Sequence, residues 1–143
     1  MKRLIYISIL LISILTGCSK APVNSDVEGF WKLRMITVLS TDETKECTDI
    51  YYSITHMITE VRFDKEEYIS LTEYCDNETK LVLKDFKVRI YGTTGDNGQN
   101  APVEKLNKLG INSQQETVFD ILHCNGKTMT LQSDYARLEL EKF

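Results

Sequence analysis

The sequence predicts an all-β domain, an antiparallel up-and-down barrel of about eight strands with one short helix between the fifth and sixth strands. Apolar and polar residues alternate along most of the chain after residue 28, as they do in strands buried on one side only. Short polar turns separate these stretches, and one segment breaks the pattern. Closing such strands into a barrel buries their apolar faces and removes the unpaired sheet edges. A two-sheet sandwich is the alternative.

The beginning of the chain has the layout of an export signal. Lys2 and Arg3 precede an uncharged apolar run that ends in Leu15-Thr16-Gly17-Cys18. The run is shorter than the roughly 20 residues of a membrane-spanning helix. The four-residue motif resembles the lipobox of bacterial lipoproteins. That resemblance implies cleavage before Cys18, a diacylglycerol on its thiol and a further acyl chain on its amine. Palmitate or a similar fatty acid would supply the acyl chains.

These features divide the chain into three parts. Residues 1–17 are predicted to be a lipoprotein signal peptide, residues 18–27 a polar lipidated tether, and residues 28–143 the barrel domain. Two or more acyl chains hold a protein durably at a membrane. Ser19 follows the lipidated cysteine in place of the aspartate found in some lipoproteins retained at the inner membrane. We therefore expect a lipid-anchored protein of the bacterial outer membrane.

Five strands are expected before the pattern breaks. Each carries apolar side chains at every second position, and the charged stretch Thr41–Glu46 is expected to be a loop. In the fifth strand, Leu81 and Leu83 have the opposite parity to Phe86, so a bulge is expected near Lys84. The five predicted strands cover residues 31–35, 50–54, 59–63, 68–74 and 81–91.

The break in the pattern is a polar loop followed by a short helix of about two to three turns. Asn100 is expected to cap this helix, Pro102 suits its first turn, Leu106 and Leu109 form its apolar side, and Gly110 ends it. Three strands then complete the domain, with a hairpin turn at Asn125-Gly126. They are centred on residues 119–121, 129–131 and 136–140.

A second resemblance concerns the first and last strands. Gly29 and Trp31 match the Gly-x-Trp signature that opens the first strand of lipocalins, and the run that closes at Phe143 resembles the last strand of lipocalin-like domains in bacterial lipoproteins. The helix lies before the sixth strand rather than after the last one, so the domain is identified as lipocalin-like rather than as a classical lipocalin. The resemblance implies carriage of a small hydrophobic molecule inside the barrel.

The residues expected to face the barrel interior are the candidate ligand-binding residues. An eight-stranded barrel either fills its interior with side chains or leaves room for one small ligand. Most of the inward residues are bulky, so a filled core is the alternative to a ligand cavity. Tyr52 would need a partner for its hydroxyl group. The candidates are Trp31, Leu33, Tyr52, Phe63, Leu71, Phe86, Phe119 and Met129, with Ile69 on the same predicted face as Leu71.

The domain contains three cysteines, which predict one disulfide and one free thiol in an oxidising compartment. Cys75 and Cys124 both end strands at the same rim of the barrel, so they are the preferred pair, and Cys47 with Cys75 is the second choice. No metal site is expected, because no Cys-x-x-Cys spacing occurs and His56 and His123 lie far apart.

The remaining composition excludes several functions. Without Lys2 and Arg3, the mature chain has 15 basic against 21 acidic residues, a net charge of about −6, so we expect no nucleic-acid partner. Neither a catalytic triad, a nucleophile elbow nor a phosphate loop occurs, so we expect no enzyme and no cofactor. The sequence predicts a membrane-anchored binder of a small hydrophobic ligand. The alternative is an envelope interaction or structural protein with a filled core, whose loops Thr41–Glu46 and Gly92–Gln99 bind a protein or a glycan.

Overall fold

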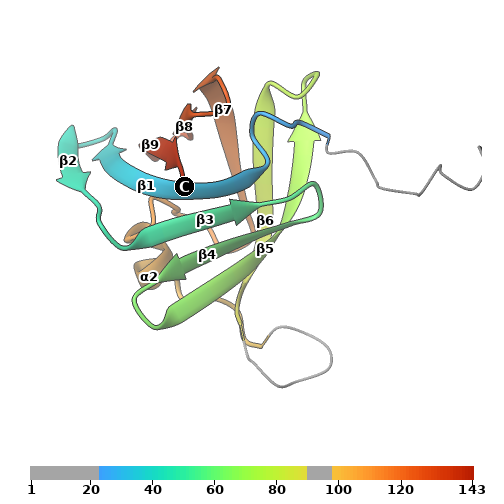
Figure 1. The fold of residues 1–143 in the computed structure, drawn as a ribbon. Helices are drawn as coiled ribbons and strands as arrows, with labels where there is room; N and C mark the ends of the chain where they lie inside the picture. The colour runs from blue at the N-terminus through green and yellow to red at the C-terminus, as the bar shows by residue number, and fades with distance from the viewer. Residues whose placement is uncertain (1–22, 90–97) are drawn as a thin grey trace, which may run out of the picture.

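The computed structural model describes residues 23–89 and 98–143, which form a closed antiparallel barrel with one additional strand (Figure 1). Strands β1 and β3 to β9 pair in the order of the chain, β2 is added at the side of β1, and β1 pairs with β9 to close the ring. The predicted all-β up-and-down barrel is therefore confirmed. The strands are β1 (Gly29–Val38), β2 (Glu43–Glu46), β3 (Ile50–Ile54), β4 (Ile58–Phe63), β5 (Glu66–Cys75), β6 (Lys80–Val88), β7 (Glu116–Cys124), β8 (Thr128–Gln132) and β9 (Ala136–Lys142). The predicted signal peptide and Cys18 lie outside the described residues, as does the end of the predicted strand 81–91.

The predicted bulge in β6 keeps apolar side chains facing the core although the alternation changes parity there. The pairing of β5 with β6 shifts register between Ile69 and Leu71, opposite Lys84 and Lys87. Asp85 at this point has a φ of 55°, in the left-handed region that aspartate tolerates better than most residues. As a result, residues on both sides of the bulge turn inward and are fully buried, namely Leu81, Leu83 and Phe86.

The position of the helix needs one correction. Glu43–Glu46, expected to be part of a loop, forms β2 and pairs with the second half of β1. Its four residues are all exposed, so it lacks the apolar alternation by which a half-buried strand is recognised. Since this strand adds one to the count, the helix α2 (Val103–Asn107) lies between β6 and β7 and not between the fifth and sixth strands.

Helix α2 is also shorter than expected and is capped differently. It contains five residues, and Pro102 takes the N-cap position without a side-chain hydrogen bond. The side-chain oxygen of Asn100, expected to be the cap, instead accepts a hydrogen bond from Lys87 Nζ at 2.7 Å. Within the described ranges, no helix has the length and hydrophobicity needed to cross a membrane.

The segment around α2 closes one end of the barrel. Leu106, Leu109 and Ile111 are fully buried and belong to the same core as the strand residues. The hydroxyl group of Tyr52, on β3, donates a hydrogen bond to the Leu109 carbonyl oxygen at 2.7 Å. The partner that the buried tyrosine required is thus supplied by the closing segment, which ties that segment to the barrel wall.

Residues 23–28, which we call the strap, cover the opposite end. Val27 is fully buried, and its carbonyl oxygen accepts a hydrogen bond from Trp31 Nε1 at 2.7 Å. The carbonyl oxygen of Glu28 accepts one from Lys142 Nζ at 2.8 Å. Val27, the last residue of the predicted tether, is thus part of the barrel core, while Val23, Ser25 and Asp26 before it are exposed.

The predicted disulfide between Cys75 and Cys124 is not formed, and all three cysteines of the described residues are free. Cys75 pairs with Lys80 of β6, and Lys80 pairs with Asp120 of β7. Strand β6 therefore separates the two cysteines, and two strand spacings of about 4.8 Å exceed the roughly 7 Å that a disulfide spans. The two residues share a rim, as expected, but they are not neighbours on it.

The three thiols are expected to react at very different rates. Cys75 is exposed, whereas Cys47 is 6% exposed and Cys124 is partly buried. Burial raises the pKa of the Cys47 and Cys124 thiols, so less of each is present as the reactive thiolate. Iodoacetamide at neutral pH should label Cys75 at least about tenfold faster than Cys47 in the folded protein. Mass spectrometry of peptides checks this result, and a linked Cys75–Cys124 peptide from unreduced protein would contradict it.

Candidate ligand-binding groove

The structure places most of the predicted ligand-binding residues inside the barrel. Phe63 is only partly buried but packs against the core. Leu71 is the exception, with 53% of its surface exposed. The fully or almost fully buried members are Trp31, Leu33, Tyr52, Phe86, Phe119 and Met129.

The orientation predicted for Ile69 and Leu71 is wrong. Tyr68, which pairs with the buried Val61 of β4, is itself buried, so alternation along β5 turns its odd-numbered residues outward. Ser70 and Thr72 take the inward positions between them. The strand therefore presents polar residues to the interior and Leu71 to the outside.

The inward side chains form one continuous core with the residues of the two closing segments. Two hydroxyl groups on this face pair with each other, since Thr59 Oγ1 and Thr72 Oγ1 lie 2.8 Å apart, whereas the buried hydroxyl groups of Tyr74 and Thr117 have no hydrogen-bond partner among the described residues. The interior residues are thus engaged with one another, and their role in holding a ligand stays a prediction. Within the described residues, no cluster of three or more His, Cys, Asp or Glu side chains is arranged to hold a metal ion.

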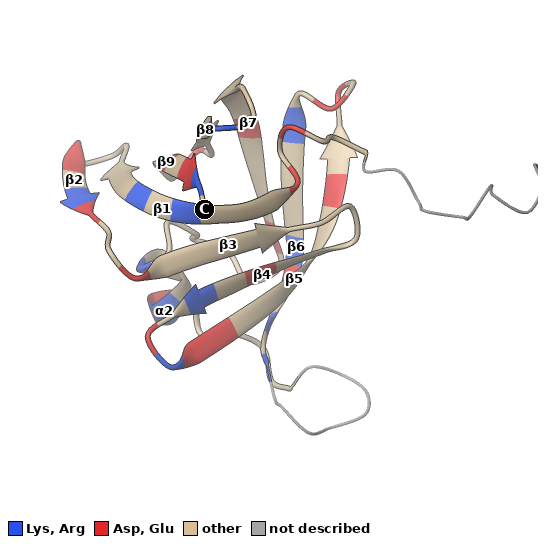
Figure 2. Cartoon of the chain, in the orientation of Figure 1, with Lys and Arg blue, Asp and Glu red and all other residues tan. Residues whose placement is uncertain are grey.

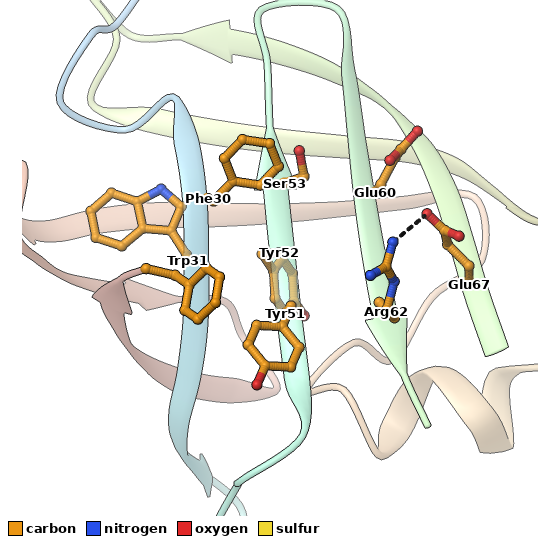
Figure 3. A pocket seen from close by; sticks show the side chains of 9 residues that line it. Phe30, Trp31, Tyr51, Tyr52, Ser53, Glu60, Arg62 and Glu67 are labelled. Atoms are coloured by element: carbon orange, nitrogen blue, oxygen red, sulfur yellow. Dashed lines mark ion pairs between the residues drawn. The ribbon is translucent and has the colours of Figure 1, made fainter. Parts of the chain in front are cut away.

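A groove of about 240 Å³ lies instead on the outer wall of the barrel, across β1, β3, β4, β5 and the C-terminus (Figure 3). It arises from the residues that alternate with the core. On β3, Tyr52 and Ile54 are buried, which leaves Tyr51 and Ser53 to point outward. The residues that line the groove are Phe30, Trp31, Tyr51, Tyr52, Ser53, Glu60, Arg62, Glu67 and Phe143.

One half of the groove is aromatic. The rings of Tyr51 and Phe143 meet edge to face, with centroids 5.4 Å apart and an interplanar angle of 70°. The backbone amide of Phe143 donates a hydrogen bond to the Phe30 carbonyl oxygen at 2.9 Å, which holds the last residue beside the first strand. Phe30 and Phe143 are 65% and 80% exposed, and Lys32 Nζ lies 5.7 Å from the centroid of the Tyr51 ring. This half offers flat apolar surface next to a positive charge.

The other half is charged. Glu67 is only 7% exposed, and its carboxylate lies 3.8 Å from Arg62 and 3.6 Å from Arg89. Arg89 also pairs with Glu60. Because the side chain of Arg62 is 64% exposed and its contact with Glu67 is long, its guanidinium group retains donors that face the solvent. The two halves together suit a molecule with an apolar body and an anionic or hydrogen-bonding end.

Sequence reasoning missed this groove because outward positions were assigned to solvent. The available signal was the occurrence of large aromatic residues, Phe30 and Tyr51, at outward positions of two strands. Phe143 joins them only because β9 pairs with β1 and brings the end of the chain to its beginning.

Comparisons with known proteins agree with the architecture. A family model described as a lipocalin-like domain matches residues 13–143. Among solved structures, a lipocalin-like protein from Bacteroides uniformis is similar with a TM-score of 0.59 at 10% identity, covering 82% of this chain and 99% of that chain. An uncharacterized protein from Bacteroides eggerthii is similar with a TM-score of 0.55 at 15% identity, covering 82% of this chain and 100% of that chain. Among curated proteins, none has significant sequence similarity to the chain.

Proposed function

Because the chain belongs to the lipocalin-like domain family, we propose that it is a non-catalytic binding protein of the bacterial cell envelope that holds a small, partly hydrophobic molecule. The observation that carries this proposal is the groove on the outer wall. It combines three aromatic side chains with an exposed guanidinium group in one concave surface, whereas the barrel interior is occupied by its own side chains. Small-molecule sites are mostly apolar clefts with a few placed polar groups, and the groove has this composition.

The groove also indicates the chemical class of the ligand. An apolar body would stack on Tyr51 and Phe143, and a carboxylate or sulfonate end would reach the donors of Arg62. Glu60 and Glu67 are already paired with arginines, so they do not oppose such an anion strongly. The volume of about 240 Å³ limits the ligand to a small molecule or to one part of a longer one.

Replacing Tyr51 with alanine is expected to weaken binding of the apolar anionic probe 1-anilinonaphthalene-8-sulfonate about tenfold, because the central ring of the aromatic half is lost. R62Q should weaken the binding of this probe while affecting a neutral apolar probe much less. Fluorescence titration measures both effects.

The matched control is Leu122→Ser, which removes an exposed apolar side chain on β7 outside the groove. It should leave the probe affinity unchanged. If Leu122→Ser weakens binding as much as Tyr51→Ala, the probe binds exposed apolar surface in general. If a core substitution such as Phe86→Leu is the variant that abolishes binding, the ligand lies inside the barrel, as the sequence predicted.

We propose further that the domain is anchored to the outer membrane through lipid on Cys18. The support is the lipobox at residues 15–18 behind a basic, apolar leader, and the family match begins upstream of it at residue 13. Cys18→Ala should remove the diacylglycerol from the mass of the mature chain and release the protein from the membrane fraction or leave it uncleaved. Intact-mass measurement and fractionation test this result, and unchanged processing with membrane retention of the variant would refute it.

A further inference from the structure

We propose that the strap end of the barrel rests on the surface of the bilayer, an inference that depends on the proposed lipid anchor at Cys18. At this end β1 begins, β9 ends, and the turns between β3 and β4 and between β7 and β8 lie beside residues 23–28 (Figure 1). Several large apolar side chains are exposed around it. They are Val23 at 46%, Phe30 at 65%, Met57 at 57%, Leu122 at 53% and Phe143 at 80%. We call these five residues the apolar rim.

The length of chain between anchor and strap brings this end to the membrane. Four residues, 19–22, lie between Cys18 and Val23. A fully extended chain covers at most about 3.6 Å in each of the five steps from Cys18 to Val23, which gives about 18 Å. The strap adds no further reach. The backbone amides of Val23 and Asn24 donate to Glu28 Oε1 at 2.8 and 3.1 Å, so the strap folds back on itself. The carbonyl oxygens of Val27 and Glu28 in turn bind Trp31 and Lys142 of the barrel.

The opposite end of the barrel has a different surface. There the described residues present the charged strand β2, the turn at Asp64 and Lys65, and α2 with Glu104 and Lys105 (Figure 2). Among the residues that the structure describes at that end, the large apolar side chains that are exposed are Leu39 and Val103. The distribution of exposed apolar side chains therefore follows the direction of the anchor.

Charge at the strap end sets how the domain tilts. The turn between β5 and β6 projects the acidic residues Asp76 and Glu78, which anionic headgroups repel. On the side of Phe30 and Phe143, Lys32 Nζ lies 5.7 Å from the centroid of the Tyr51 ring, and the Lys127 carbonyl oxygen accepts a hydrogen bond from the backbone amide of Lys142. These two lysines provide positive charge there. Aromatic and lysine side chains together are typical of the membrane–water interface. We infer that the Phe30–Phe143 side lies lowest, so that the aromatic half of the outer groove opens next to the headgroups.

A tryptophan scan of the lipidated full-length protein tests this orientation. Met57→Trp places a fluorophore on the apolar rim, and Val103→Trp places one on α2 at the far end. Each is reconstituted in vesicles of phosphatidylcholine with one-fifth phosphatidylglycerol, with and without bromine on the acyl chains. The parent chain supplies the baseline, because its Trp31 is fully buried.

The expected result is at least a twofold loss of the added fluorescence for Met57→Trp with brominated lipid and no loss for Val103→Trp. Flotation of the vesicles reports separately on the anchor. Protein that does not float overturns the anchor and the docked orientation together. Protein that floats but shows equal quenching at both positions, or none at residue 57, overturns the docked orientation and leaves the anchor standing.

Discussion

Replacing Trp31 with alanine is expected to lower the free energy of unfolding by about 3–5 kcal/mol, as for other large buried aromatic residues. Trp31 is fully buried, and its indole donates the hydrogen bond that holds Val27 and the strap. The ammonium group of Lys142, 4.4 Å from the ring centroid, would lose its aromatic contact as well. Urea unfolding followed by circular dichroism measures the difference.

The neighbouring residue provides a matched control. Phe30 is 65% exposed, so Phe30→Ala is expected to lower the free energy of unfolding by less than about 1 kcal/mol. The same variant should weaken probe binding in the outer groove, which Phe30 lines. Equal destabilisation by the two substitutions would contradict the assignment of adjacent residues of β1 to opposite faces.

Much of the barrel could be predicted from the sequence because one physical constraint acts on every strand. A strand with water on one side and the core on the other needs alternate apolar residues, and β3 and β9 display that alternation completely. The change of parity between Leu83 and Phe86 even indicated the bulge, since both had to be buried on one face. Asn125-Gly126 indicated a hairpin, and Gly126 adopts the positive φ of 80° that such turns use.

The predictions for β2 and β5 were wrong because these strands do not place apolar residues at every second position. Strand β2 has no buried face, so its residues carry no alternation. Along β5, the inward Ser70 and Thr72 are acceptable because their hydroxyl groups bond to Thr59 of β4. Because of these hydrogen bonds, the polar residues of β5 can face the core and Leu71 can face outward. The apolar residues of this strand therefore do not mark its inward face.

The groove could not be predicted for a different reason. Its aromatic half joins Phe30, Tyr51 and Phe143, which come from the first strand, the third strand and the last residue of the chain. Which outward residues become neighbours depends on the closure of the ring and on its register, Trp31 opposite Tyr52 and Lys142. A pattern along one strand determines which face a residue occupies but not which residues of other strands lie beside it.

Gly110→Ala is expected to lower the free energy of unfolding by about 2–5 kcal/mol, from a left-handed backbone and from overpacking of the core. Gly110 follows α2 with a φ of 81°. A Cβ atom there would lie only 2.3 Å from Cδ2 of Leu138, a fully buried side chain of β9. The alanine must therefore displace either the core or the segment that closes this end of the barrel, and urea unfolding measures the cost.

Two comparisons separate the backbone effect from the collision. Gly126 has nearly the same φ, 80°, but a Cβ atom there meets nothing closer than Asp26 Oδ1 at 3.5 Å, so Gly126→Ala should cost only about 1–2 kcal/mol. Leu138→Ala alone should cost about 2–5 kcal/mol through the cavity it leaves. Combined with Gly110→Ala, it should cost clearly less than the sum of the two, because the new methyl group enters the vacated space. Additive losses would mean that α2 and its closing segment move away from the barrel instead of pressing on Leu138.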